Sequence, residues 1–261
     1  MARPIALITG ASAGIGNAFA HGLAARGYDL VVVARDTARL DALAKELEAA
    51  HGTATEVLTA DLLDVAQVET VEARLADGDR PIELVVNNAG FGTVGHFKDL
   101  PLDREVQEIA LNVVALTRLM HAALPNMLER RTGGVINVSS MAAFQPTPSN
   151  ATYGATKAFV SSLSQGVHEE LRGTGVNVMA LCPGFTRTEF QSRAGIDSTD
   201  IPNFLWQEAS TVVDSAMKAF EKGKAVCVPG PLNQATAGFS ATVPSGVSRR
   251  IAGMVVKRAE K

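Results

Sequence analysis

Short runs of apolar residues recur along the chain, separated by longer stretches in which apolar residues return every three to four positions. Continuous apolar runs of this length are typical of strands buried on both faces of a parallel sheet. We therefore predict seven buried strands. They lie at residues 5–9, 30–34, 55–59, 82–87, 135–138, 176–181 and 225–228.

Helical patterns fill the stretches between these runs, so strands and helices alternate along most of the chain. Alternation with short connections is typical of a doubly wound α/β fold, in which a parallel sheet carries helices on both faces. No linker rich in Pro, Gly or Ser interrupts the pattern, and we predict a single domain over residues 1–261. The predicted helices span residues 14–26, 38–50, 64–77, 101–130, 150–173 and 209–222.

Two segments fall outside this alternation. Residues 189–206 have mixed polarity and predict a mobile loop with a short helix. Residues 231–261 predict extra C-terminal helices, split near residues 244–246, with apolar positions Val247, Ile251 and Val255 at helical spacing beside basic residues. We interpret this extension as amphipathic and packed on the domain; a cover over an apolar pocket and a contact with a membrane surface are the alternatives.

The composition is that of a globular protein, with 46% hydrophobic and 20% charged residues among 261. A net charge of −3 argues against nucleic acid or an anionic membrane as the main partner. No apolar run is long enough for an integral membrane segment and no signal peptide is recognisable, so we expect a cytoplasmic protein. Cys182 and Cys227 lie beside apolar runs and are expected to be buried free thiols. No metal site is predicted.

A glycine-rich turn follows the first predicted strand and opens the first helix. Gly10, Gly14 and Gly16 allow the backbone to approach a bound group closely, and the free N–H groups of a helix N-terminus favour a phosphate. The Gly-xxx-Gly-x-Gly spacing differs from the standard dinucleotide fingerprint. Both a pyrophosphate site and a purely structural tight turn fit this segment.

Two other motifs overlap this turn. A phosphate-binding P-loop would need Lys and then Ser or Thr after Gly16, and the sequence has neither. Residues 10–14 also match the G-x-S-x-G nucleophile elbow of α/β-hydrolases, which is followed by an acid and then by a histidine. None of the five histidines lies in a late loop beyond the last strands, so we disfavour a hydrolase.

The end of the second strand distinguishes two nicotinamide cofactors. An acidic residue there binds the ribose 2′-hydroxyl of NAD, whereas an arginine nearby accommodates the 2′-phosphate of NADP. Ala34 leaves no acid at the strand end, and Arg35 follows at once. NADP(H) is therefore favoured. Asp36 keeps NAD(H) as an alternative, and a solvated surface charge is the other interpretation of Arg35.

Tyr153 and Lys157 are four positions apart in a helical pattern and so share one face. An ammonium beside a phenol favours the phenolate, which makes the tyrosine a usable acid and base near neutral pH. Such a pair is common by chance, but Ser140 stands thirteen residues earlier (153 − 140) at the end of a strand. Its hydroxyl is predicted to donate to a substrate carbonyl oxygen, with Ser139 as the rival.

Further polar residues lie at or near the carboxyl ends of the predicted strands, where open parallel sheets bind ligands. Residues 87–90 end the fourth strand, residues 183–188 end the sixth, and Asn112 lies in the long helix after the fourth. We expect these segments to meet at one edge of the sheet and to form one site.

With these motifs the chain resembles the short-chain dehydrogenase/reductase family over residues 4–228. The resemblance implies a Rossmann fold and hydride transfer between a nicotinamide cofactor and a secondary alcohol or ketone. It matches Asn112, Ser140, Tyr153 and Lys157 to the family's catalytic tetrad. Tyr153 would exchange a proton with the substrate oxygen, Ser140 would orient that oxygen, and Lys157 would bind the nicotinamide ribose and lower the Tyr153 pKa. Asn112 would hold a water that leads from Lys157 to solvent, or is only an amide that kinks a helix.

The same resemblance makes residues 1–188 the cofactor and catalytic core and residues 189–206 the substrate loop. Asp61 would contact the adenine, Asn88 the adenosine ribose, and Thr188 the nicotinamide carboxamide or the pyrophosphate. The predicted cofactor-binding residues are Gly10, Ser12, Gly14, Ile15, Gly16, Arg35, Asp61, Asn88, Ala89, Gly90, Tyr153, Lys157, Pro183, Gly184, Thr186 and Thr188.

Apolar loop residues favour an apolar or lipid-like substrate, such as a 3-oxoacyl chain or a steroid; the alternative is that they are ordinary core and lid residues. Many relatives end soon after the seventh strand, whereas this chain continues, which favours a homodimer through residues 101–130 and 150–173 over a tetramer. A catalytically silent NADP-binding sensor or scaffold, and an epimerase or dehydratase, are the alternative functions. The apolar loop residues are Phe144, Phe185, Phe190, Phe204, Leu205 and Trp206.

Overall fold

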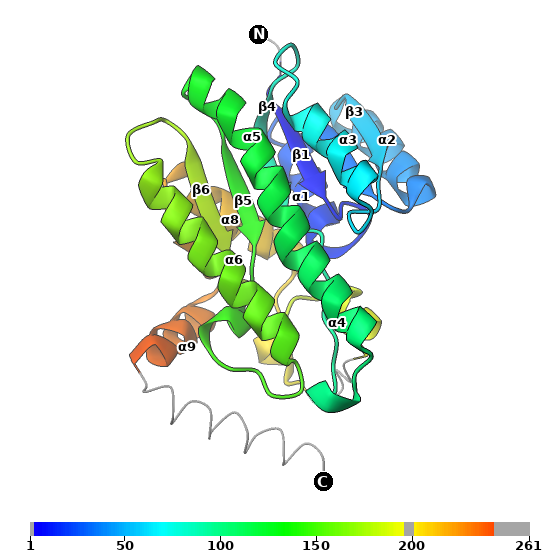
Figure 1. The fold of residues 1–261 in the computed structure, drawn as a ribbon. Coiled ribbons are helices and arrows are strands. Elements are labelled where there is room, and N and C mark those ends of the chain that lie inside the picture. The colour runs from blue at the N-terminus through cyan, green and yellow to red at the C-terminus, as the bar shows by residue number, and fades with distance from the viewer. Residues whose placement is uncertain (1–2, 196–200, 243–261) are drawn as a thin grey trace.

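A seven-stranded parallel sheet forms the centre of the molecule in a computed structural model, which describes residues 3–195 and 201–242 (Figure 1). Its strands are β1 (Ile5–Thr9), β2 (Asp29–Ala34), β3 (Thr55–Thr59), β4 (Ile82–Asn87), β5 (Gly134–Val138), β6 (Asn177–Leu181) and β7 (Val226–Cys227). They follow the order β3-β2-β1-β4-β5-β6-β7. The direction of winding reverses between β1 and β4, and such a switch point opens a crevice at the carboxyl ends of the strands. The predicted fold class is confirmed.

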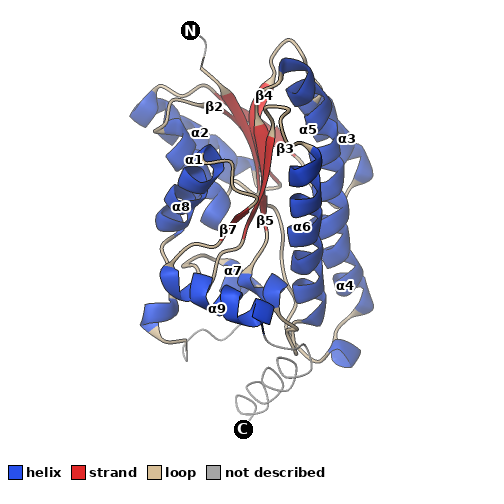
Figure 2. Ribbon diagram, turned by 90° about the vertical axis from the view of Figure 1, so that its left-hand side faces the viewer, coloured by secondary structure: helices blue, strands red, loops and turns tan. Residues whose placement is uncertain are grey.

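Helices cover both faces of the sheet. With the sheet seen on edge, α1, α2 and α8 lie on one side and α3, α4, α5 and α6 on the other, while α7 and α9 lie near the carboxyl ends of the strands (Figure 2). The helices are α1 (Gly14–Ala24), α2 (Thr37–His51), α3 (Val65–Leu75), α4 (Leu102–Ile109), α5 (Leu116–Arg130), α6 (Ala151–Glu170), α7 (Phe190–Arg193), α8 (Ala209–Glu221) and α9 (Pro231–Thr242).

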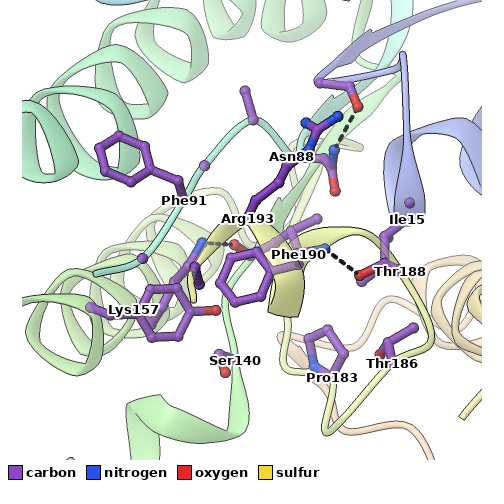
Figure 3. A pocket seen from close by; sticks show the side chains of 18 of the residues that line it. Ile15, Asn88, Phe91, Ser140, Lys157, Pro183, Thr186, Thr188, Phe190 and Arg193 are labelled. Carbon is purple, nitrogen blue, oxygen red and sulfur yellow. Dashed lines mark hydrogen bonds between the residues drawn. The ribbon is translucent and has the colours of Figure 1, made fainter. Parts of the chain in front are cut away.

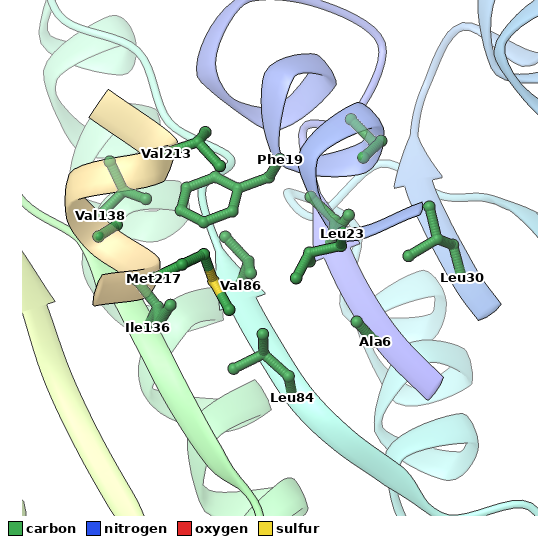
Figure 4. Packing of buried hydrophobic residues seen from close by; sticks show 14 of the residues in the cluster. Ala6, Phe19, Leu23, Leu30, Leu84, Val86, Ile136, Val138, Val213 and Met217 are labelled. Atoms are coloured by element: carbon green, nitrogen blue, oxygen red, sulfur yellow. The ribbon is translucent and has the colours of Figure 1, made fainter. Parts of the chain in front are cut away.

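The alternation of side chains along each strand divides the core into two layers. In β1, Ala6 and Ile8 pack toward α1 and α8, whereas Leu7 packs in the opposite layer with α3 and α5. Phe19 of α1 and Met217 of α8 fill the first layer over the middle of the sheet (Figure 4). Both faces are therefore dry, which is why the strands read as continuous apolar runs.

The long helix predicted at residues 101–130 is interrupted. α4 passes into a π-helical segment, Ala110–Ala115, before α5 begins. A π turn gives the local backbone a different phase from the flanking helices, and such turns are frequent at functional sites. Asn112 lies within this segment. The prediction of one uninterrupted helix over residues 101–130 was therefore wrong. The interruption contains Asn112, which was predicted to lie in the site.

The two segments outside the alternation contain short elements. Residues 189–206 contain α7 and a 3₁₀ turn, Asn203–Leu205, and residues 196–200 lie outside the described part of the chain. The first piece of the C-terminal extension is α9, and the predicted second piece, with Val247, Ile251 and Val255, lies outside the described residues. Among the described helices, none has both the length and the apolar character needed to cross a bilayer. Cys182 and Cys227 are buried free thiols, as predicted.

Candidate active site

A cavity of about 1230 Å³ runs along the carboxyl ends of the strands and connects the glycine turn with the Tyr153 and Lys157 pair. Arg35 and Asp61 lie at the end that the glycine turn closes, and Ser140 lies at the Tyr153 end. Every predicted site residue except Gly16 and Asn112 lines this cavity. The structure therefore brings the separate motifs together into one continuous space.

The glycine turn has a geometry that only glycine adopts without strain. Gly10 and Gly14 have φ values of 66° and 57°, in the left-handed region. A Cβ at Gly16 would stand 2.3 Å from the Gly10 carbonyl oxygen, so this glycine lets α1 start directly beneath the turn. Ala13 stands at the N-cap of α1 and provides no side-chain cap, whereas Asp36 caps α2. The first N–H groups of α1 thus remain for an anion, and the turn fits a pyrophosphate.

Arg35 and Asp36 have different surroundings at the end of β2. The Arg35 side chain is 72% exposed and lines the cavity, with Asp61 3.9 Å away. The Asp36 carboxylate accepts a hydrogen bond of 3.0 Å from the backbone N–H of Arg39 and so caps α2. Asp36 lines the same cavity, but its use as a helix cap weakens its candidacy for the ribose.

Asn88 ties the end of β4 to the glycine turn. Its Nδ2 donates to the carbonyl oxygens of Thr9 at 2.9 Å and of Gly10 at 3.3 Å, and its backbone N–H donates to Thr9 Oγ1 at 3.0 Å. Ala89 N–H donates to the same hydroxyl. These bonds hold the floor of the cavity in place, and the side chain of Asn88 faces into it (Figure 3).

Ser139 and Ser140 are neighbours in the sequence but make different hydrogen bonds. Ser139 Oγ is buried, donates to the Lys157 carbonyl oxygen at 2.8 Å and lies 2.8 Å from Ser161 Oγ. Ser140 Oγ accepts a hydrogen bond from Ala142 N–H and interacts with the Tyr153 hydroxyl. The Ser139 hydroxyl therefore fastens α6 to β5, whereas the Ser140 hydroxyl shares the cavity with Tyr153.

Burial shifts both ionisable groups of the α6 pair toward their uncharged forms. It raises the pKa of Tyr153 to about 12, against a hydrogen bond with Ser140 that lowers it. It also lowers the pKa of Lys157, which is 4% exposed, to about 8. Lys157 Nζ donates to the Val138 carbonyl oxygen at 2.8 Å and lies 5.6 Å from the centre of the Tyr153 ring. Desolvation is thus the largest influence on the Tyr153 pKa, and the lowering of that pKa by Lys157 and an oxidised cofactor stays a prediction.

Asn112 is fully buried behind the cavity wall. Its Oδ1 accepts from the backbone N–H of Phe91, and its Nδ2 donates to the Phe91 carbonyl oxygen and to Thr156 Oγ1. A Cβ on Gly90 would stand 2.8 Å from Asn112 Oδ1 and 3.5 Å from Lys157 Nζ. Asn112 thus clamps the loop after β4 to α6 beside Lys157, and its role toward a water stays a prediction.

The segment after β6 closes the cavity opposite β4. The Thr188 side chain lies next to Gly14, and its Oγ1 accepts a hydrogen bond from Phe190 N–H (Figure 3). The Phe190 ring projects into the cavity and lies 5.5 Å from the Tyr153 ring. Pro183 and Thr186 line the same wall (Figure 3).

The apolar lining agrees in part with the prediction. Phe185, Phe190 and Leu205 line the cavity, whereas Trp206 packs beside Phe185 at a ring distance of 5.8 Å without lining it. Phe144 and Phe204 lie outside the lining as well. No group of three or more His, Cys, Asp or Glu side chains that could hold a metal ion occurs among residues 3–195 and 201–242.

Sequence reasoning missed several residues of the cavity wall. Phe91 lines it one residue beyond the predicted end of the β4 motif, and its ring lies 4.5 Å from the guanidinium carbon of Arg104. Asn150, Leu232 and Asn233 also line it. The strand-end rule could have found Phe91, but nothing in the local pattern of α9 distinguishes its cavity face from its solvent face.

Comparison with known proteins identifies the family. A family model described as short chain dehydrogenase matches residues 4–198. The chain belongs to the short-chain dehydrogenase/reductase family. It is an oxidoreductase, as its relatives are.

Individual members of the family resemble the chain over most of its length. A short-chain dehydrogenase from Sphingobium yanoikuyae, solved in complex with NADPH, is 41% identical with a TM-score of 0.83, over 92% of this chain and 96% of that one. The bulky-bulky ketone specific alcohol dehydrogenase from Comamonas testosteroni is 34% identical with a TM-score of 0.78, over 92% and 95%. The very-long-chain 3-oxoacyl-CoA reductase of Bos taurus is 32% identical, over 95% of this chain and 78% of that protein.

Proposed function

We propose that this protein interconverts a secondary alcohol and a ketone with NADP(H), using Tyr153 as the acid and base. The observation that carries the proposal is the single cavity, which has a phosphate-binding turn at one end and the hydroxyls of Tyr153 and Ser140 at the other. A dinucleotide that lies along such a cavity places its nicotinamide next to a carbonyl group bound at Tyr153.

The fit to NADP(H) rests on residues at the adenosine end. The Arg35 guanidinium is exposed at the cavity, while Asp36 is occupied as the cap of α2. A planar guanidinium binds phosphate oxygens in pairs, which suits a 2′-phosphate. The NADPH complex of the Sphingobium relative supports the same choice. NAD(H) remains the alternative cofactor, because a relative from Burkholderia phymatum is described in complex with NAD.

The residues at the other end divide the chemistry between them. The cofactor supplies or accepts the hydride. The Tyr153 phenol, whose pKa burial raises still further above neutral pH, is protonated and donates its proton to the substrate oxygen during reduction. Ser140 orients that oxygen through a second hydroxyl, and Lys157 is placed to bind the nicotinamide ribose. Asn112 holds the loop and α6 at the spacing that this geometry needs.

The substrate is proposed to be a bulky, apolar ketone or alcohol. Apolar side chains from several separate parts of the chain line the Tyr153 end, and α9 contributes one of them. The bulky-ketone dehydrogenase and the 3-oxoacyl-CoA reductase among the relatives support this class. The apolar residues around the Tyr153 end are Phe91, Leu111, Met141, Phe185, Phe190, Leu205 and Leu232.

We further propose that the protein is cytoplasmic and forms a homodimer.

The decisive experiment compares two tyrosine variants. Tyr153→Phe removes the proton donor and should lower kcat for an aromatic ketone by about 1000-fold, with NADPH binding nearly unchanged, because a positioned acid contributes about 100- to 10,000-fold. Tyr28→Phe alters the other tyrosine, which lies outside the cavity lining, and should keep full activity. NADPH oxidation and NADPH fluorescence titration measure the two quantities. Full activity of Tyr153→Phe would refute the mechanism, and a wild type that binds NADPH but turns over no ketone, aldehyde or 3-oxoacyl thioester would favour the silent sensor.

A further inference from the structure

Two glutamates of α4 are buried beside the proposed site and take no part in the chemistry described above. Glu105 is 3% exposed and Glu108 is fully buried, although their neighbours Arg104 and Val106 are exposed. An uncompensated carboxylate is costly in such surroundings. No ion pair joins either carboxylate to a Lys, Arg or His within the described residues. Any negative charge on them must therefore be stabilised by hydrogen bonds or removed by protonation.

The hydroxyl of Thr93, in the loop after β4, lies between the two carboxyl groups. Thr93 Oγ1 is 2.5 Å from Glu105 Oε1 and 2.9 Å from Glu108 Oε2. The Thr93 backbone N–H also donates to Glu108 Oε2 at 3.1 Å, and Thr152 Oγ1 donates to Glu105 Oε2. Glu108 Oε1 is buried without a hydrogen-bond partner in the structure.

The number of protons on Thr93 Oγ1 and the two carboxyl groups decides which of these contacts can be hydrogen bonds. A threonine hydroxyl has one proton and can donate it to only one of the two carboxyl oxygens. The second short oxygen–oxygen contact becomes a hydrogen bond only when that carboxyl group carries a proton and donates it to Thr93 Oγ1. Glu105 has the shorter Thr93 contact and a second hydroxyl donor in Thr152. These contacts favour Glu105 as the partner that carries the negative charge and Glu108 as the partner that carries the proton.

The pair is attached to both sides of the Tyr153 end of the cavity. Thr93 follows the loop residues Phe91 and Gly92, which line the cavity, and Thr152 directly precedes Tyr153 in α6. α4 packs against α6. The charged groups that act on Glu108 are Glu105 from its own helix and Lys157 from α6, and Glu108 acts in turn on Tyr153.

We propose that Glu105 and Glu108 share one proton across the Thr93 hydroxyl, and that this pair is a positioning group for the reaction. It fastens the loop after β4 to the start of α6, and its net charge sets the electrostatic field at Lys157 and Tyr153. The first half of the proposal stands on the contacts of Thr93. The second half rests on the proposed roles of Tyr153 and Lys157.

The sign of the pH effect follows from the charges. Burial raises the pKa of Glu108 to about 7, so the shared proton is lost as pH rises through neutrality. The second negative charge that appears then raises the pKa of Lys157 and of Tyr153. Glu108→Gln keeps an uncharged side chain of the same shape at every pH. It should therefore move the alkaline limb of ketone reduction, where Tyr153 loses its proton, to lower pH by about half a unit.

Infrared spectroscopy tests the shared proton without using turnover. The carbonyl band of a neutral carboxylic acid should be present at about pH 6 in the wild type and should disappear at about pH 8. Glu108→Gln should remove this band, and Thr93→Val, which lacks the bridging hydroxyl, should shift its titration. Thr93→Ser restores the hydroxyl and should restore the wild-type titration, while Glu129→Gln on the exposed side of α5 should change nothing. A band that is missing from the wild type, or that persists in Glu108→Gln, would overturn the shared proton.

The positioning role is tested by the pH profile of kcat for ketone reduction. Glu108→Gln should keep near wild-type kcat at about pH 6, with an unchanged KM and the displaced alkaline limb. Thr93→Val and Thr93→Ser repeat the comparison if Glu108→Gln does not fold, and only the valine variant should depart from the wild type. Profiles that coincide with the wild type in both Glu108→Gln and Thr93→Val would refute the positioning role. Failure of the Tyr153 mechanism would instead appear in Tyr153→Phe and would leave the infrared titration intact.

Discussion

Burial moves Tyr153, Lys157 and Glu108 toward their uncharged forms, each in the direction that its chemistry dictates. The phenol and the carboxylic acid hold their protons more firmly, and the amine holds its proton less firmly. In the proposed reduction, a carbonyl substrate would meet a protonated phenol, which is the form that donates. The positive nicotinamide ring of an oxidised cofactor would oppose this effect and favour the phenolate in the reverse direction.

Arg35 is the residue on which the cofactor assignment depends most. Arg35→Ala removes a charge-assisted contact with a 2′-phosphate, which is worth about 1.5–3 kcal/mol, and so should weaken NADPH binding about 10- to 150-fold. NADH has no 2′-phosphate, so its dissociation constant should change little. Fluorescence titration with both cofactors measures the ratio, and Lys45→Ala, an exposed cation on α2, is the matched control. An equal loss of affinity for NADPH and NADH would defeat the assignment.

At the level of elements, the strands could be predicted because burial on both faces leaves an unbroken apolar run, as in β1 and β4. The helix from α4 to α5 could be predicted only in outline, because the π segment around Asn112 depends on contacts with Phe91 and Thr156. Glu105 and Glu108 could not be recognised at all. Two acids in an amphipathic helix look like a solvated face until the tertiary structure shows them buried against Thr93.

α9 is the element whose contribution to substrate binding is most open to test. Leu232 lies at its start and lines the cavity, while Phe239 on the same helix lies outside the lining. Leu232→Ala removes part of an apolar wall and costs about 1 kcal/mol of binding energy, so KM for a bulky aromatic ketone should rise about fivefold. Its NADPH affinity should stay unchanged, and Phe239→Ala should leave both constants near the wild type. An unchanged KM in Leu232→Ala would show that α9 does not contact the substrate.

On the scale of the whole molecule, one layer of helices, formed by α4, the π segment and α6, faces the site on one side and solvent on the other. α4, the π segment and α6 carry Glu108, Asn112 and Lys157 on their buried faces. Their outer faces expose large apolar side chains, and α5 and α6 lie side by side there (Figure 1). A second copy of the chain that covered this surface would contact the same helices that carry Glu108, Asn112 and Lys157, so the assembly and the site would share these elements. The exposed apolar residues of this layer are Val106, Ile109, Val114 and Phe159.

A homodimer through this layer makes a specific prediction about one valine. Val114 is 50% exposed, and Val114→Asp would place a charge in a two-fold interface, where each copy buries it once, so the dimer should dissociate. Val65 on α3 is exposed to a similar degree, at 59%, but lies outside the layer, and Val65→Asp should leave the assembly intact. Sedimentation velocity at micromolar concentration measures both. Because the pair of α4 and α6 frames Tyr153, the monomeric variant should also lose part of its kcat while it keeps its affinity for NADPH. A wild type that sediments as a monomer, or a Val114→Asp variant that remains a dimer, would place the interface elsewhere.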